Sequence, residues 1–140
     1  MKFIVLLIKT PFIDMEIKLV YLGDLKFNLK VWKRELKFHL DELEKFEKKL
    51  EEIASRNLGI DAMAPLEGFQ NKIIHEKEII GKMLQRIRMK RRIIESSDLS
   101  EEIDGRLRNQ QTSLKDDMKI YIKLHYELKE DLMDYFLRWL

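Results

Sequence analysis

A chain of 140 residues is expected to form one domain. Its 27 basic and 25 acidic side chains nearly balance, which excludes a protein that binds polyanions merely through a large positive net charge. It has no cysteine, which excludes a disulfide framework, a thiolate metal site and a cysteine nucleophile. With 45% hydrophobic residues, two prolines and five glycines, the composition favours a substantial core built from a few long elements.

The chain begins with its most apolar run, MKFIVLLI. A lysine, a proline and Asp14 follow without a small-residue cleavage site, so we expect no export signal. The run is far shorter than the roughly 20 apolar residues that span a bilayer, so we expect no membrane partner and a cytoplasmic protein. Residues 1–24 are predicted to form an N-terminal arm packed on the rest of the chain. The alternative is that the residues before Met15 are translated upstream of the true start.

A first helix is predicted over residues 25–56. Its apolar residues recur at alternating steps of four and three, which places them on one helix face and is incompatible with the period of two in a strand. Asp24 suits the N-cap, while Asp14 could cap an earlier start if Gly23 is tolerated inside the helix. The residues from Asn57 to Gly59 indicate a left-handed C-cap. The stripe comprises Leu25, Leu29, Trp32, Leu36, His39, Leu43, Phe46, Leu50 and Ile53.

A second helix is predicted over residues 65–96. Pro65 marks its start, because the first turn of a helix does not need the missing amide proton. Glu76 and Lys90 interrupt an otherwise apolar stripe. Its members are Leu66, Phe69, Ile73, Glu76, Ile80, Met83, Ile87, Lys90 and Ile94.

A third helix is predicted over residues 98–139. Ser97 and Asp98, with the acidic residues that follow, provide oxygen caps and negative charge for a helix N-terminus. Gln111 and His125 are the polar members of its stripe. The full set is Leu107, Gln111, Leu114, Met118, Tyr121, His125, Leu128, Leu132, Tyr135 and Trp139.

Short connections predict an all-α, antiparallel three-helix bundle of coiled-coil-like helices over residues 25–140. At about 1.5 Å per residue, the first two helices would be about 45 Å long and the third about 60 Å. The aromatic end of the third helix would then extend beyond its partners. Either the loop between the first two helices covers this end, or a second copy of the chain does. We expect a homodimer formed through Leu132, Tyr135, Phe136 and Trp139.

The three histidines are candidate metal ligands. Metal-binding bundles typically carry Glu-x-x-His on each of two helices, and this chain lacks that pattern. Folding the chain at its two turns places His39 level with Ser113 or Leu114, about 18 Å along the axis from His125. Zinc needs all its ligands about 2 Å from one point. We therefore expect no metal and no cofactor, and interpret His39, His75 and His125 as hydrogen-bonded structural residues.

Glu76 is a polar residue on an apolar stripe, so it must find a partner. The correct alignment of the helices would supply that partner, and the residue would then fix their register. Lys119 and the hydroxyl of Tyr121 are the partners that the expected alignment offers.

A basic run without acidic residues lies in the second helix. Phosphate contacts need clustered Lys and Arg, so nucleic-acid binding is the alternative function. We prefer a structural interpretation, because positive charge near a helix C-terminus complements the dipole and the run lacks stacking aromatics. The candidate residues are Arg86, Arg88, Lys90, Arg91 and Arg92.

The segment from Glu67 to Asn71, followed by the isoleucine-rich stretch from Ile73 to Ile80, comes after a first helix that ends in the residues from Ile53 to Asn57. These stretches resemble a group of small all-helical proteins from Bacteroidetes-type bacteria. The resemblance covers about half of the chain and implies a cytoplasmic bacterial protein. It implies no activity.

Enzymatic signatures are missing: the chain has no Gly-rich phosphate loop and no serine elbow. We therefore expect a non-enzymatic helical bundle that acts in protein-protein interaction or self-assembly, with a second copy as the first partner and another protein as the next. Nucleic-acid binding through the basic face is the second interpretation, and a carboxylate-histidine metal bundle is the third.

Overall fold

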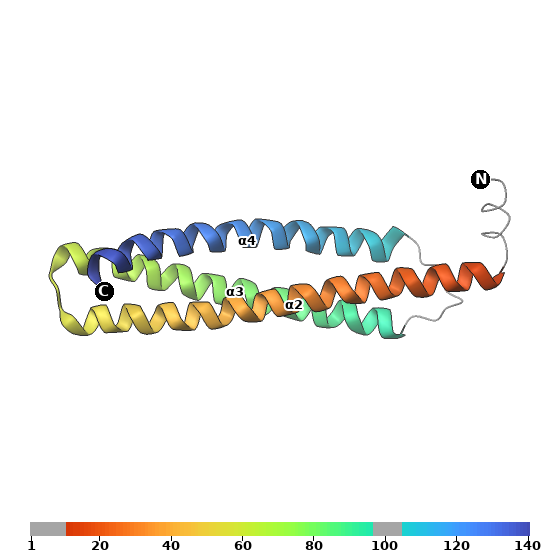
Figure 1. The fold of residues 1–140 in the computed structure, drawn as a ribbon, viewed down its shortest axis with the longest axis horizontal. Helices are drawn as coiled ribbons and strands as arrows, with labels where there is room; N and C mark the ends of the chain where they lie inside the picture. Colours follow the sequence, from red (N-terminus) through yellow and green to blue (C-terminus); the bar gives the residue numbers. More distant parts are fainter. Residues whose placement is uncertain (1–10, 97–104) are drawn as a thin grey trace.

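The computed structural model of the protein describes residues 11–96 and 105–140, with side chains placed for residues 22–96 and 111–140. Three helices make up this part of the chain: α2 (Pro11–Arg56), α3 (Ile60–Ser96) and α4 (Gly105–Trp139). They lie side by side as one elongated bundle, with α3 antiparallel to α2 and α4 (Figure 1). The expected all-α three-helix architecture is confirmed.

The first helix begins at Pro11 and not at Leu25. Proline suits the first helical position, and an internal Gly23 costs only about 1 kcal/mol. The section of the predicted arm from residue 11 to residue 24 is therefore helical, and α2 runs beyond the described ends of its partners (Figure 1). Residues 1–10, the remainder of that arm, lie outside the described residues.

The turn between α2 and α3 is tighter than expected. Asn57 and Gly59 both have positive φ angles, 50° and 100°, which confirms the left-handed cap. The amide of Met63 donates to the carbonyl of Gly59 at 3.0 Å, so α3 begins at Ile60. Pro65 lies inside the helix and does not start it. Near a helix terminus, its missing amide removes only one backbone hydrogen bond.

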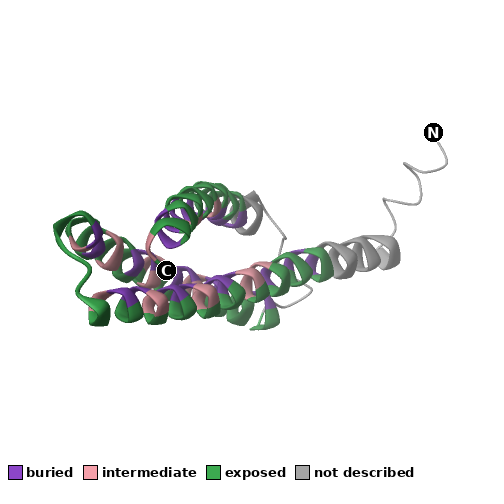
Figure 2. Ribbon diagram, turned by 60° about the vertical axis from the view of Figure 1, so that its left-hand side comes forward, coloured by how far each residue is buried: buried purple, intermediate pink, exposed green. Residues whose placement is uncertain are grey.

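The four-three stripes form the core. Leu36, Leu43, Leu50, Ile73 and Ile80 are among the side chains with no exposed surface. The buried residues follow the inner sides of the helices, and the outer sides are exposed (Figure 2). No helix in the described ranges has a stretch long and apolar enough to cross a membrane.

The alignment of α4 against α2 differs from the expected one. Contacts between the two helices join residues that are 82, 86 and 87 positions apart. The expected alignment placed His39 level with residue 113 or 114, so these offsets are larger than expected by about 7–13 residues, or about 10–20 Å. In an antiparallel hairpin, moving the turn by one residue changes the register by two. The start of α3 five residues earlier therefore accounts for about five positions of this change. The rest lies between α3 and α4, where Glu76 meets His125 instead of Lys119 or Tyr121.

The new alignment brings the end of α4 level with the α2–α3 turn. The guanidinium of Arg56 donates to the carbonyls of Trp139 and Leu140 at 3.3 and 3.1 Å. These are carbonyls that a helix C-terminus otherwise leaves without partners. The third helix therefore does not extend beyond its partners at this end of the bundle.

Candidate functional site

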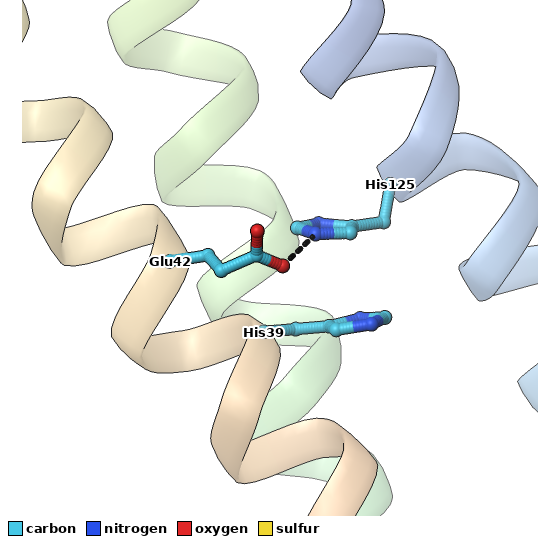
Figure 3. Close-up of side chains that lie close together, drawn as sticks. All are labelled: His39, Glu42 and His125. Atoms are coloured by element: carbon cyan, nitrogen blue, oxygen red, sulfur yellow. Dashed lines mark hydrogen bonds and ion pairs between the residues drawn. The ribbon is translucent and has the colours of Figure 1, made fainter.

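Two histidines meet at the centre of the bundle. His39 of α2 and His125 of α4 stack with their ring centroids 3.9 Å apart and their planes 12° from parallel (Figure 3). Both side chains are almost fully buried. The expected separation of about 18 Å between them is therefore wrong, because it used the wrong register. His75 lies on the exposed face of α3 and takes no part.

His125 is held between two carboxylates. Its Nδ1 lies 2.9 Å from Oε1 of Glu76, and its Nε2 lies 3.2 Å from Oε1 of Glu42. An ionised carboxylate only accepts hydrogen bonds, so the imidazolium form, in which both ring nitrogens donate, is the form that serves both carboxylates. Burial opposes this charge, but the hydrogen bonds to Glu76 and Glu42 outweigh it and raise the pKa of His125.

Glu42 lies between the buried contact of His125 with Glu76 and the solvent. Its Oε2 accepts a hydrogen bond of 2.5 Å from Nζ of Lys129, and about 15% of its side chain is exposed. Burial raises the pKa of Glu42, but the hydrogen bonds from Lys129 and His125 outweigh this effect and lower it overall. The charges therefore alternate through Glu76, His125, Glu42 and Lys129, which is the order that makes a buried ionic network tolerable.

His39 is the neutral member of the stacked pair. Burial and the neighbouring charge of His125 lower the pKa of His39. Its Nε2 lies 3.0 Å from Oε1 of Glu35, and its Nδ1 lies 3.1 Å from the hydroxyl of Tyr121. Because Glu35 accepts, Nε2 carries the proton, and Tyr121 donates to Nδ1. Burial raises the pKa of Tyr121, which keeps this hydroxyl protonated.

The arrangement also contains a set of potential metal ligands. One ligand atom from each of His39, Glu42 and His125 lies within 4.8 Å of the others (Figure 3). Two imidazoles and a carboxylate are donors that zinc accepts in proteins. The four-three stripes included both histidines but did not predict that they meet. Glu42 lies one position before Leu43, outside the apolar stripe of α2, and nothing in the sequence distinguished it from the other acidic residues of that helix.

Glu76 and the side-chain nitrogen of Gln111 find partners, as buried polar groups should, whereas the side-chain oxygen of Gln111 is buried and has no hydrogen-bond partner among the described residues. The partner of Glu76 is His125, and neither Lys119 nor Tyr121 takes that position. The side-chain nitrogen of Gln111 donates to the backbone carbonyl of Leu25 at 3.1 Å. The contact of Glu76 joins α3 to α4, and the contact of Gln111 joins α4 to α2. Each contact ties two helices together at a particular position along the bundle, which is what a residue that fixes the register would do.

The proposed self-association residues lie in the core of a single chain. Leu132, Tyr135 and Phe136 are buried, and Trp139 is half-buried. The hydroxyl of Tyr135 donates to the carbonyl of Ala62 at 2.5 Å. The first turns of α3 thus cover the aromatic end of α4. Of the two alternatives for this end, cover by the segment after the first helix is the one that the structure has, because residues expected in the loop form the first turns of α3.

The basic run of α3 is divided around the helix. Arg86 pairs with Asp117 of α4 at 2.6 Å, and Arg91 pairs with Glu95 at 3.0 Å. Lys90 is buried, with 6% of its surface exposed. Among the described residues, Arg88 and Arg92 are the exposed members outside these two ion pairs, so the five residues do not form one continuous surface of unpaired cations.

A different basic surface lies between α2 and α3. We call it the basic groove: a depression of about 630 Å³ with six basic side chains and one acidic one, Glu95. Its cations are Lys26, Lys30, Lys33, Arg34, Lys37 and Arg91. Within the described part of the chain, none of the five α2 cations forms an ion pair. Their recurrence every three or four residues, with Lys33 and Arg34 adjacent, is a sequence signal of this surface, but the contiguous α3 run is the more conspicuous cluster.

Comparisons with protein-family models, curated proteins and solved structures gave no match for this chain.

Proposed function

We propose that the protein binds single-stranded nucleic acid through the basic groove. The observation that supports this best is the convergence of six cations from two helices on one depression with a single carboxylate. Clustered Lys and Arg supply the phosphate contacts on which nucleic-acid affinity depends. Nucleic-acid binding was the alternative function indicated by the sequence, with the basic run of α3 as its site. The proposal keeps that function and places it on the basic groove between α2 and α3.

Charge distribution supports this choice over the α3 run. Arg86 and Arg91 each have a carboxylate partner, whereas the five α2 cations in the groove have none among the described residues. An unpaired cation gains a phosphate contact without breaking an existing ion pair. From Lys26 to Lys37 the cations cover about 16 Å of helix, enough for several phosphates of one strand.

An exposed aromatic side chain favours a single strand over a duplex. Phe27 lines the groove with 64% of its surface exposed. A base stacked on an aromatic ring contributes about 1–3 kcal/mol, and only an unpaired base offers its face. The α3 run lacks such a ring, and α2 supplies it.

Fluorescence anisotropy with a labelled single-stranded oligonucleotide tests the proposal. Contact with five phosphates would give a slope of log affinity against log salt of about −3.5. The double variant Lys30→Gln/Arg34→Gln should weaken binding at least about tenfold, because two phosphate contacts are lost. Phe27→Ala should weaken binding to the single strand more than binding to a duplex of the same sequence.

The matched control is Lys45→Gln/Lys48→Gln, which removes the same charge from exposed positions of α2 outside the groove. This variant should bind within about twofold of the wild type. Equal loss in both double variants would show attraction by overall charge and contradict a groove site. No binding at low salt would also contradict it.

Self-association is the second candidate function, on a surface other than the predicted one. Met89 and Ile93 of α3 line one depression between α3 and α4, and Ile120 and Leu124 of α4 line a second one, with all four side chains at least two-fifths exposed. Exposed apolar side chains grouped in this way are typical of association sites. Light scattering should give a dimer mass for the wild type and a monomer mass for Ile120→Lys/Leu124→Lys. A monomeric wild type would contradict this candidate.

A further inference from the structure

We propose that His39, Glu42 and His125 form a binding site for a divalent transition-metal ion, with Zn²⁺ as the best fit. The site lies in the core between α2 and α4, apart from the basic groove, and does not depend on nucleic-acid binding. Two imidazoles and one carboxylate leave a fourth position of a tetrahedral zinc ion open. Imidazole donors favour Zn²⁺ over the oxygen-seeking Mg²⁺ and Ca²⁺.

The spacing of two ligand atoms already suits the ion. Nε2 of His125 and Oε1 of Glu42 are 3.2 Å apart. With zinc bonds of about 2.0–2.1 Å, the edge of a coordination tetrahedron is about 3.3 Å long. A zinc ion can therefore replace the proton that these two atoms share without moving the helices. The ion takes Oε1, which leaves Oε2 of Glu42 on Lys129.

His39 supplies the third ligand after its ring tilts. In the stacked arrangement the two ring planes are nearly parallel, so their in-plane lone pairs do not meet at one point. A tilt about the side-chain bonds of His39 directs one nitrogen at the ion. The other nitrogen can keep its existing hydrogen bond, either to Glu35 or to Tyr121.

The surrounding groups are those that orient metal-bound histidines. Glu76 accepts the hydrogen bond from Nδ1 of His125 and so presents Nε2 to the ion. Three carboxylates, those of Glu35, Glu42 and Glu76, surround the two imidazoles and offset the charge of the ion. The carboxylate of Glu42 is partly exposed, which gives the ion a route from solvent.

Calorimetry with Zn²⁺ alone and absorption spectroscopy with Co²⁺ alone test the site. We expect one ion per chain and the d–d bands of tetrahedral Co²⁺. At a hundredfold excess over the dissociation constant, Zn²⁺ should raise Tm by about 5 °C or more. His39→Gln and Glu42→Gln should each weaken binding at least about tenfold, with helix content checked by circular dichroism.

His75→Gln is the matched control, because His75 is an exposed histidine of the same chain. This variant should bind Zn²⁺ as the wild type does. Equal loss in His75→Gln would show binding to surface histidines and overturn the proposal. A wild-type protein with no calorimetric signal and no Tm change in Zn²⁺ would overturn it without use of any variant. Neither result would bear on the basic groove, which is tested with oligonucleotides.

Discussion

The contact between Glu76 and His125 shows how a single polar pair specifies an arrangement of helices. Apolar side chains tolerate small slides along a neighbouring helix, because one leucine contact resembles the next. A buried carboxylate does not, since losing its partner costs several kcal/mol. Glu76 and His125 come from α3 and α4 and are both buried. In the described alignment each of these groups satisfies the other, and a slide along the helices would separate them.

We predict that Glu76→Leu lowers the free energy of unfolding by about 3 kcal/mol. The leucine adds apolar surface, but it leaves Nδ1 of His125 without its acceptor. Glu76→Gln keeps an acceptor oxygen and should cost less than half as much. Urea denaturation of the three proteins measures both effects. A leucine variant with a higher Tm and an unchanged, single oligomeric state would show that Glu76 does not fix the register.

Tyr135 gives a prediction for alkaline pH. Burial raises the pKa of Tyr135 in the folded protein, whereas the unfolded chain has the ordinary tyrosine value of about 10. Below pH of about 10 the hydroxyl is protonated in both states, and its hydrogen bond to Ala62 stabilises the fold by about 1 kcal/mol. Above that pH the unfolded tyrosine ionises first, so this contribution is lost as pH rises.

Tyr135→Phe should therefore be less stable than the wild type by about 1 kcal/mol near pH 8. The difference should shrink at about pH 11, because phenylalanine has no proton to lose. Urea denaturation of both proteins at the two pH values provides the measurement. A difference that stays constant, or grows, would contradict the assigned direction of the pKa shift.

At the scale of the helices, sequence pattern identified nearly every buried residue but not which of them meet. The stripes depend only on the period of the helix, which is fixed by backbone geometry. Their pairing depends on where each turn begins. Pro65 is a sound start signal, but tertiary burial of Ala62 and Leu66 extends α3 back to Ile60. A later start at Pro65 shifts the expected levels of His39 and His125 apart.

The candidate sites were less predictable than the core, because they depend on how the helices are aligned with one another. Both the stacked histidines and the basic groove consist of residues from two helices, so neither exists within one segment of sequence. The periodic lysines from Lys26 to Lys37 were visible in the sequence. Their convergence with Arg91 was not, because it required the α2–α3 register.

Two glycines allow opposite predictions for the same substitution. Gly59 has a φ angle of 100°, a conformation that strains any residue with a β-carbon, so Gly59→Ala should destabilise the fold by about 1–2 kcal/mol. Gly81 lies inside α3, and an added β-carbon would have nothing within 4 Å. Gly81→Ala should therefore stabilise the fold by about 0.5–1 kcal/mol. Thermal denaturation would contradict these predictions if both variants changed stability in the same direction.

For the whole molecule, each helix depends on the others for its position. Arg56 at the end of α2 contacts the carbonyls that end α4, and Tyr135 of α4 contacts the first turn of α3. The three helices are thus connected at the turn end, and the histidine pair connects α2 to α4 at the centre. One register therefore applies from the turn to the centre of the bundle, and a single distance between two helices can test it.

Cross-linking provides that test, because the chain has no native cysteine. Arg86 and Asp117 form a partly exposed ion pair between α3 and α4, so a short bis-maleimide should join Arg86→Cys to Asp117→Cys in high yield. Arg86→Cys with Glu127→Cys places the second thiol about 15 Å further along α4 and should react poorly within one chain. Mass spectrometry of dilute protein separates these products from cross-links between chains. Equal yields from the two pairs, or a higher yield from the second, would show that α3 and α4 do not hold the described register.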